Sequence, residues 1–521
     1  MAKKSRKTGA PAASSAPPKP TCLKCGFISS LPQNKREPPP SRLKALLSTN
    51  ATLLEAEKTS FQKAKEDLPL VISDLDERIT QTQQLLCALM EERAQAAIDL
   101  RNAKAVLHPM RALPDDILGE IFQYSTPTWD EMADAARRFT YHDSLNPKSG
   151  PWLLAQICRN WRSVVLSMPL LWSCISLDFN VYFKQMDRPK DVALQLAIHL
   201  QRARRSPLSI RIESGSDINL HSAFPIVLSS MSQWRHLHIR TPVSSFHELA
   251  RCKAFLESLE EVQIDASLFP IHTQDIATFQ MASNLRRLEL YEHGHFYGHN
   301  LHLGWGQLTH LFAQIDCDGI FRYFKELKNL VSLRLSFSSG IRKFDVLSRR
   351  ITLPKVQYLS LRRRGSANAA NAVNTVAGVF DMLDLPSLRM LVFAATEADG
   401  GPMLLDLPSS LSHPYRQLDV VSLKYPKYDL TIPANRSRFL DILSQVSDVT
   451  QLSLDVQNIG ADVIQKLTPT DDVNFFPRLN TINFNRSTFA VPQSDVQDML
   501  NARKKFADAS TGGGLVELRT N

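Results

Sequence analysis

Hydrophobic residues follow two different periods along this chain of 521 residues. From Leu68 onward they recur at alternating steps of four and three residues, and ten of the twelve positions reached in this way are apolar. This spacing keeps one stripe of a helix apolar and is typical of a coiled-coil seam. The twelve positions are Leu68, Ile72, Leu75, Ile79, Thr82, Leu86, Leu89, Arg93, Ala96, Leu100, Ala103 and Leu107.

The seam belongs to a helical, coiled-coil segment that we expect over residues 41–108. Pro69 suits the first turn of a helix, so the interval 43–65 is predicted as a separate, shorter helix. His108–Pro109 ends the segment, because a residue before proline is disfavoured in helical geometry. The seam has to pack either on the first helix, as a hairpin, or on a second chain, as a homodimer. A rigid spacer helix is the third interpretation, and the pattern is compatible with all three.

The second period begins after Pro207, where a short motif recurs ten times with starts 22 to 32 residues apart. Its usual form is L-x-x-L-x-L. The last two apolar positions are separated by one residue, as in a strand with one buried face. The ten copies are Trp234–Ile239, Leu259–Ile264, Leu285–Leu290, Leu308–Leu311, Leu330–Leu335, Val356–Leu361, Leu388–Phe393, Leu418–Leu423, Val449–Leu454 and Leu479–Phe484.

We predict one strand for each copy, a first strand at Leu208–Ile212, and helices around 192–200 and 439–443. The motif and its period resemble the leucine-rich repeat, which implies an α/β solenoid over residues 190–500 with a C-terminal tail at 501–521. A doubly wound α/β sheet is the alternative, but the sequence has no Gly-rich phosphate loop after a strand.

Solenoids of this kind bind partners through strand side chains that alternate with the buried ones. We therefore place substrate binding on that open face. The candidate residues are His236, His238, Glu289, Arg334 and Arg362.

A small amphipathic module lies between the two patterns. Pro114 suits a first helical turn, and an apolar stripe follows it at Ile117, Leu118, Ile121 and Phe122. Residues 125–151 contain scattered proline and glycine and are predicted as an irregular insertion. A second helix is expected from about Leu153 to Leu166, and the block 168–175 closes the unit.

Three blocks of this module occur in the order found in the F-box: LPDDILGEIF at 113–122, ICRNWR at 157–162 and SMPLLWSCI at 167–175. Residues 109–178 therefore resemble the all-α F-box in its fungal form. The resemblance implies docking on the Skp-type adaptor of a cullin-based ubiquitin ligase. Of the implied contacts, Ile157 and Trp161 are expected to lie partly in the core. The implied contacts are Leu113, Pro114, Ile117, Leu118, Ile121, Ile157, Cys158 and Trp161.

The composition of the chain indicates a disordered N-terminal segment and a cellular location. Residues 1–40 form a basic, Pro-rich arm that we expect to be disordered. A net charge of +9, 43% hydrophobic and 22% charged residues are ordinary values for a soluble protein, and we do not expect nucleic acid as a partner. No apolar run is long enough for a membrane span or signal peptide, and seven scattered cysteines fit a reducing compartment, so we expect the cytoplasm or the nucleus.

Catalytic and metal-binding patterns are weak. Cys22 and Cys25 supply only half of a tetrahedral zinc site, with no second Cys or His pair nearby. Four imidazoles, His293, His295, His299 and His302, could hold a metal, but they lie in a Gly- and aromatic-rich loop with no nearby cysteine or rigid helix to fix them. We therefore expect no metal, no cofactor and no enzymatic activity. The sequence predicts a substrate-recognition adaptor subunit of a Skp–cullin–F-box ubiquitin ligase that holds a protein substrate on the repeat surface. The alternative is a non-catalytic repeat scaffold that dimerises through the N-terminal helix without ligase coupling.

Overall fold

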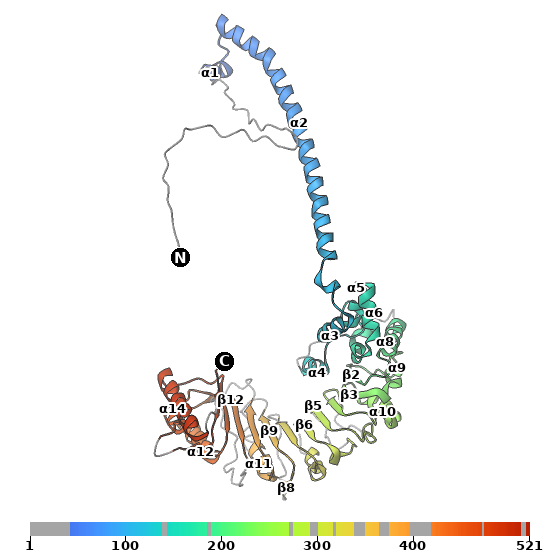
Figure 1. Cartoon of the computed structure of the whole chain (residues 1–521), viewed down its shortest axis with the longest axis vertical. Helices are drawn as coiled ribbons and strands as arrows, with labels where there is room; N and C mark the ends of the chain where they lie inside the picture. The colour runs from blue at the N-terminus through green and yellow to red at the C-terminus, as the bar shows by residue number, and fades with distance from the viewer. Residues whose placement is uncertain are drawn as a thin grey trace, which may run out of the picture. The chain divides into compact units, whose positions relative to one another are not determined.

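The computed structural model describes residues 42–137, 143–184, 189–269, 275–291, 301–315, 319–337, 350–363, 375–395, 418–470, 474–511 and 517–520. The chain divides into two compact units, Met1–Ala112 and Leu113–Asn521 (Figure 1). The predicted arm at 1–40, with Cys22 and Cys25, lies outside the described residues.

One long helix dominates the first unit. α1 (Leu43–Ser48) is followed by α2 (Glu55–Val106), which has 52 residues and continues through Pro69. At its start, the Glu57 carboxylate accepts a hydrogen bond from the Leu54 amide at 3.0 Å and lies 3.6 Å from the guanidinium of Arg42. Within the predicted helical segment 41–108, the described residues are helical at Leu43–Ser48 and Glu55–Val106 and not helical between these two helices. A separate first helix is present, but it ends at Ser48, so its predicted extent of 43–65 is wrong.

Pro69 fails to end α2 because proline removes a single amide donor, and the helix is long enough on both sides to keep the rest of its hydrogen bonds. The end of α2 at Val106 agrees with the stop predicted at His108–Pro109. A 3-10 turn, η1 (Pro109–Arg111), follows, and the Nδ1 atom of His108 accepts a hydrogen bond from the Met110 amide at 3.2 Å.

The second unit begins with the predicted helical module. Pro114 precedes α3 (Asp115–Ser125), which buries Leu118 and Phe122. Gly119 lies so close to the Met168 side chain that an added Cβ would come within 2.5 Å of its sulfur. α3 therefore packs closely on the segment that leads into the 3-10 turn η2 (Pro169–Trp172).

The predicted second helix of this module is two helices. α5 (Gly150–Ile157) and α6 (Arg159–Ser167) are separated by Cys158, whose backbone is extended with φ −157° and ψ 171°. The Cys158 Sγ accepts a hydrogen bond from the Trp161 amide at 3.5 Å and so caps α6. The prediction of a single helix over Leu153–Leu166 is therefore wrong. The sequence pattern did not reveal the break, because one extended residue hardly changes the spacing of the apolar residues.

The insertion at 125–151 is not wholly irregular, as it contains α4 (Trp129–Arg137). Thr128 and Glu131 form a reciprocal cap at its start, where each side chain accepts a hydrogen bond from the other residue's amide, at 3.4 and 2.9 Å. The side chains of Trp129, Met132 and Ala133 are buried. The T-x-x-E capping sequence was thus a usable signal for a helix that the scattered prolines concealed.

Among the described residues, the rest of the unit is built around a parallel sheet of 13 strands, in which the order in space is the order along the chain. Every pair of neighbours is parallel. A separate two-stranded sheet pairs β8 (Ile351–Thr352) with β10 (Leu383–Asp384). The strands of the long sheet are β1 (Cys174–Asp178), β2 (Leu208–Glu213), β3 (Trp234–Arg240), β4 (Glu261–Asp265), β5 (Arg287–Tyr291), β6 (His310–Ile315), β7 (Ser332–Phe337), β9 (Tyr358–Arg363), β11 (Met390–Ala395), β12 (Val420–Asp429), β13 (Gln451–Gln457), β14 (Thr481–Asn485) and β15 (Glu517–Thr520).

Helices and 3-10 turns connect the strands, and α8, α9 and α10 lie along one side of the sheet (Figure 1). The helices predicted near 192–200 and 439–443 are present as α8 and α12. The connecting elements are α7 (Phe179–Lys184), α8 (Pro189–Ala203), α9 (Phe224–Ser229), η3 (Met231–Gln233), α10 (Val243–Arg251), η4 (Lys253–Phe255), η6 (Trp305–Gln307), η7 (Gly319–Glu326), α11 (Thr375–Met382), α12 (Pro433–Gln445), α13 (Ala461–Leu467) and α14 (Gln493–Thr511).

All ten recurring motifs form strands, and their apolar positions fill the core. In β5, for example, Leu288 and Leu290 are each 1% exposed, because alternate strand residues point to the same face. The strand order never reverses, as it would in a doubly wound sheet. The fold is α/β with a long, open parallel sheet and an N-terminal helix.

Both predicted ends of the sheet domain are wrong. β1, within the block expected to close the helical module, precedes the strand at Leu208 and buries Ile175 and Leu177. At the other end, α14 continues to Thr511 and β15 pairs with β14, so 501–521 is not simply a tail.

Candidate functional site

Among the described residues of the helical module, several apolar side chains on α3 and α5 remain exposed although their neighbours form its core. Ile117 and Ile121, one turn apart on α3, are 40% and 38% exposed, and Leu153 and Ile157, one turn apart on α5, are 44% and 54% exposed. α3 and α5 are in contact, and Pro114 at the start of α3 is exposed as well. We call Pro114, Ile117, Ile121, Leu153 and Ile157 the docking patch.

The other residues implied by the F-box resemblance have different surroundings. Leu118 is 0% exposed and belongs to the core, so it cannot touch a partner directly, contrary to the prediction. Trp161 is half-buried, with its ring 4.8 Å from that of Phe122, whereas Ile157 is far more exposed than we expected. Cys158 is exposed and Leu113 is partly buried.

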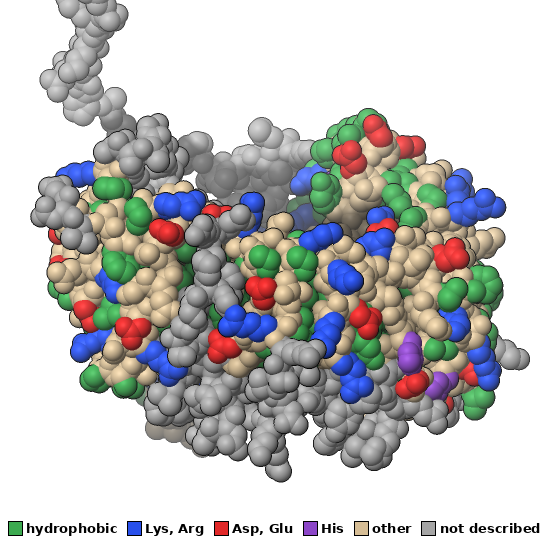
Figure 2. Space-filling model, turned by 90° about the horizontal axis from the view of Figure 1, so that it is seen from below, with side chains coloured by type: hydrophobic (Ala, Val, Ile, Leu, Met, Phe, Trp, Pro, Cys, Tyr) green, Lys and Arg blue, Asp and Glu red, His purple; other side chains and the backbone are tan. Residues whose placement is uncertain are grey.

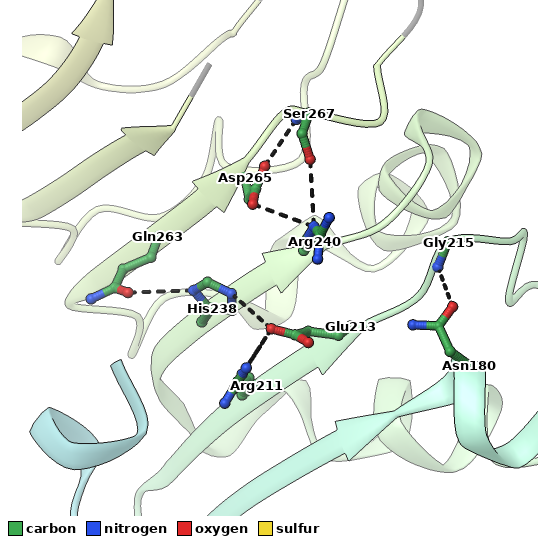
Figure 3. Close-up of polar contacts among 9 residues, drawn as sticks. All are labelled: Asn180, Arg211, Glu213, Gly215, His238, Arg240, Gln263, Asp265 and Ser267. Carbon is green, nitrogen blue, oxygen red and sulfur yellow. Dashed lines mark hydrogen bonds and ion pairs between the residues drawn. The ribbon is translucent and has the colours of Figure 1, made fainter. Parts of the chain in front are cut away.

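The open face of the sheet carries the side chains that alternate with the buried leucines. On the first strands these side chains form a buried polar cluster (Figure 3). The Arg211 guanidinium donates a hydrogen bond from Nε to the Oε1 atom of Glu213 at 3.0 Å, and the Nδ1 atom of His238 lies 3.4 Å from the amide oxygen of Gln263. Because that oxygen can only accept, Nδ1 of His238 carries the proton.

His238 is 5% exposed, and its Nε2 atom has no hydrogen-bond partner among the described residues. Nε2 lies 3.8 Å from Oε1 of Glu213. Burial lowers the pKa of His238 from 6.5 to about 4, and the nearby Glu213 carboxylate opposes this shift. The imidazole is therefore neutral at neutral pH and forms no ion pair with Glu213.

Further polar contacts lie next to this cluster, at the ends of β2, β3 and β4. Arg240 lies 3.4 Å from Asp265, and that carboxylate also accepts the Ser267 amide at 2.9 Å (Figure 3). The Asn180 side chain accepts the Gly215 amide at 2.6 Å and ties α7 to the end of β2. The charged side chains of this cluster are therefore paired with one another within the fold, Arg211 with Glu213 and Arg240 with Asp265.

Helix α4 covers the adjacent part of the open face. The Trp129 ring stacks on His236, with centroids 5.3 Å apart and planes 18° apart, and its Nε1 donates to Glu261 at 3.0 Å. The Nδ1 atom of His236 lies 2.9 Å from the Ser209 hydroxyl, and burial lowers the pKa of His236. Sequence reasoning missed Trp129, because no local pattern reveals a contact across more than a hundred residues.

The remaining predicted substrate-binding residues are Glu289, Arg334 and Arg362. Glu289 is 7% exposed and accepts hydrogen bonds from Arg334 at 3.0 Å and from the Tyr291 hydroxyl at 2.7 Å. Arg334 and Arg362 are exposed. Of the five predicted substrate residues, His236, His238 and Glu289 are thus buried or half-buried in contacts of the fold, and two arginines face solvent.

Charged side chains of both signs are interspersed on the face of the molecule shown in Figure 2, without a broad patch of one sign. The exposed guanidinium of Arg287 similarly lies 3.7 Å from the nearly buried Glu261 carboxylate. Sequence reasoning did not include Arg287, although it occupies the same strand position as the predicted His236.

The described residues contain no group of three or more histidine, cysteine or acidic side chains suited to a metal ion. His302 is paired with Asp275 at 3.0 Å, while His293, His295 and His299 lie outside the described residues. The four described cysteines are free. Among the described helices, none is long and apolar enough to cross a membrane.

No family model and no curated protein matches this chain. A Bacteroides fragilis protein, whose crystal structure was solved by a structural genomics consortium, is similar at 13% sequence identity with a TM-score of 0.21. The match covers 54% of this chain and 67% of that chain. Similarity at this level supports no conclusion about fold or function.

Proposed function

We propose that this chain is the substrate-recognition adaptor subunit of a Skp–cullin–F-box type ubiquitin ligase. Its helical module would be an F-box that docks on a Skp-type adaptor, and its parallel sheet would be a degenerate leucine-rich-repeat solenoid that holds a protein substrate. Other subunits would carry out the transfer. The chain would act by proximity, because binding both partners raises the effective concentration of substrate lysines near the ubiquitin donor.

The observation that carries this proposal is the exposure of the docking patch. An amphipathic helix that served only to close a core would bury its apolar stripe, as α3 does with Leu118 and Phe122. Ile117 and Ile121 lie on the same helix and stay exposed, together with Leu153 and Ile157 on α5. Apolar side chains grouped on two contacting helices suit a partner with a hydrophobic groove.

A proximity function also needs the docking helices to be held firmly on the sheet domain, and an aromatic cluster supports this. Trp152 of α5 donates to the Nδ1 atom of His199 on α8 at 3.2 Å, and the His199 Nε2 atom lies 3.1 Å from the Trp172 carbonyl oxygen. Burial lowers the pKa of His199 to about 3, so the ring stays neutral and makes both hydrogen bonds. The guanidinium of Arg202 lies 4.5 and 4.6 Å from the centroids of the Trp152 and Trp172 rings.

For the substrate, the exposed side chains of the middle strands are the best candidates. α4 covers part of β3 and β4, so a partner on the open face has access to the strands that follow. Arg334 on β7 and Arg362 on β9 are exposed there. We place substrate contacts at these two arginines, and no longer at His236, His238 or Glu289.

The test is co-expression of the full chain with a Skp-type adaptor, followed by size-exclusion chromatography with light scattering. The test variant is Ile117→Asp/Ile121→Asp. The matched control is Leu194→Asp/Phe255→Asp, which places the same charges at exposed apolar residues of α8 and η4, at 63% and 58% exposure. We expect the wild type and the control to co-elute with the adaptor, and the test variant to elute alone.

Because all four substituted side chains are exposed, both variants should fold, which circular dichroism checks. If the folded wild type does not bind the adaptor, the ligase proposal is wrong and the scaffold alternative gains support. If the test variant still binds as tightly as the control, the docking patch is not the binding surface.

A further inference from the structure

Within its own unit, Met1–Ala112, the seam of α2 has no partner among the described residues. α2 contains no buried residue, and its large apolar seam side chains are about half exposed: Leu68 46%, Ile72 54%, Ile79 53%, Leu86 56%, Leu89 53% and Leu100 57%. A helix in water does not keep such a stripe exposed over its whole length without cost. The seam is therefore an interaction surface.

A hairpin does not cover this surface. α1 has six residues and is about 9 Å long, whereas the seam from Leu68 to Leu107 extends over about 60 Å. The contact of α1 with α2 lies at the start of α2, where Arg42 meets Glu57 at 3.6 Å. Another helix of comparable length can bury the whole seam, and a second copy of this chain supplies one.

We propose that the chain forms a homodimer in which two copies of α2 pack antiparallel along this seam, with Leu86 of each copy opposite Leu89 of the other. The remaining pairs follow from this register. The pairs are Leu68 with Leu107, Ile72 with Ala103, Leu75 with Leu100, Ile79 with Ala96, and Thr82 with Arg93.

Side-chain volume favours this direction. In the antiparallel register each alanine of the seam faces an isoleucine, so every apolar layer contains at least one large side chain. A parallel, in-register pair would place Ala96 against Ala96 and Ala103 against Ala103, and these layers would be underpacked. It would also place the two Arg93 guanidinium groups in one layer, whereas the antiparallel pair sets each beside the hydroxyl of Thr82.

The residues that flank the seam are compatible with this direction. In antiparallel helices the positions just before the first core residue of each heptad meet one another. Arg78 of one copy then lies near Asp99 of the other, and Val71 lies near Val106. Each of these contacts occurs twice by symmetry, and the same register brings Leu85 near Glu92. A parallel pair would bring Asp99 near Lys104 and Leu85 near Met90, so the flanking residues suit either direction and the core layers favour the antiparallel one.

Light scattering of the full chain tests the dimer, which should have twice the chain mass of 58.6 kDa. Leu86→Lys/Leu89→Lys should make it monomeric. The control Leu70→Lys/Ile98→Lys adds the same charges at positions 74% and 45% exposed on the far side of α2 and should remain dimeric. A monomeric wild type at tens of micromolar, or a dimer that the seam variant leaves intact, would overturn the proposal.

Disulfide trapping tests the direction on a background in which Cys22, Cys25, Cys87 and Cys158 are replaced by serine and which itself forms no covalent dimer. Oxidised Ile79→Cys/Ala96→Cys should run as a covalent dimer on a non-reducing gel, and Ala96→Cys alone should not. A covalent dimer from Ala96→Cys alone would show a parallel pair and would overturn the antiparallel register. Because no described residue of α2 is buried, these substitutions leave the sheet domain folded, and its thermal unfolding serves as the check.

Discussion

The contact of Trp129 with the open face gives the sharpest stability prediction. Trp129 is 9% exposed, stacks on His236 and donates a hydrogen bond to Glu261. Removal of a buried tryptophan side chain costs about 3–5 kcal/mol in well-packed cores. In Trp129→Ala the Glu261 carboxylate keeps a hydrogen bond from Gln263 at 3.0 Å, so no buried charge is left unpaired. We therefore expect the lower end of that range, about 3 kcal/mol.

Two further variants separate the parts of this contact. Trp129→Phe keeps an aromatic ring on His236 and loses the hydrogen bond, so it should cost about 1 kcal/mol. In a double-mutant cycle, Trp129→Ala and His236→Ala should show a coupling of about 1 kcal/mol, as expected for stacked rings. The control Tyr124→Ala removes an aromatic ring that is 93% exposed and should change the unfolding free energy by less than about 0.5 kcal/mol.

The assay is urea unfolding followed by circular dichroism, with hydrogen exchange of the α4 amides measured in parallel. Local release of α4 would appear as faster exchange in 129–137 while the strands stay protected. A cost for Trp129→Ala as small as that of Tyr124→Ala would refute the reasoning, because it would mean that α4 is not packed on the sheet.

Three other predictions concern two buried polar groups, His238 and Arg503, and the helix cap at Cys158. The folded pKa of His238, about 4, lies below its ordinary value of 6.5, so its contribution to stability is present above pH 6.5 and is lost as the pH falls toward 4. The loss is on the order of 3 kcal/mol, and His238→Gln should flatten the acid side of a urea-midpoint profile; an unchanged slope would contradict this. Arg503 is 3% exposed and donates to the carbonyl oxygens of Leu467 and Phe476 at 2.6 and 3.0 Å, so Arg503→Ala should cost about 2–4 kcal/mol in urea unfolding, whereas no effect would show that α14 is dispensable. Cys158→Ser should raise the melting temperature slightly, since a hydroxyl caps α6 better than a thiol, and a decrease would argue against this cap.

The strands were predictable because their signal is local. Each recurring motif places its apolar residues one position apart, and the long spacing between copies leaves room for a returning helix or turn. The T-x-x-E sequence at Thr128 could have revealed α4 for the same reason. Local patterns therefore account for most of the elements, including the long helix that ends before His108–Pro109.

The errors concern contacts between residues far apart in the chain. Leu118 and Ile117 are neighbours in one apolar stripe, yet one is core and the other exposed, and only the packing of α5 and α6 decides which. His238 and Glu289 were assigned to a partner because polar strand residues look available in sequence. In the fold, His238 contacts Gln263 and Glu289 pairs with Arg334. Both contacts join different strands, and the sequence pattern does not indicate which polar side chains meet.

The strand order of the long sheet also bears on how the chain folds during synthesis. Each strand of the long sheet after β1 pairs with the strand that precedes it in that sheet, so one hydrogen-bonding partner has already left the ribosome when it emerges. Loops between partners are short on the scale of the chain, and each closure costs little entropy. The helices that carry the docking patch precede β1. They can therefore fold and pack against the first strands while the residues of β14 are still untranslated.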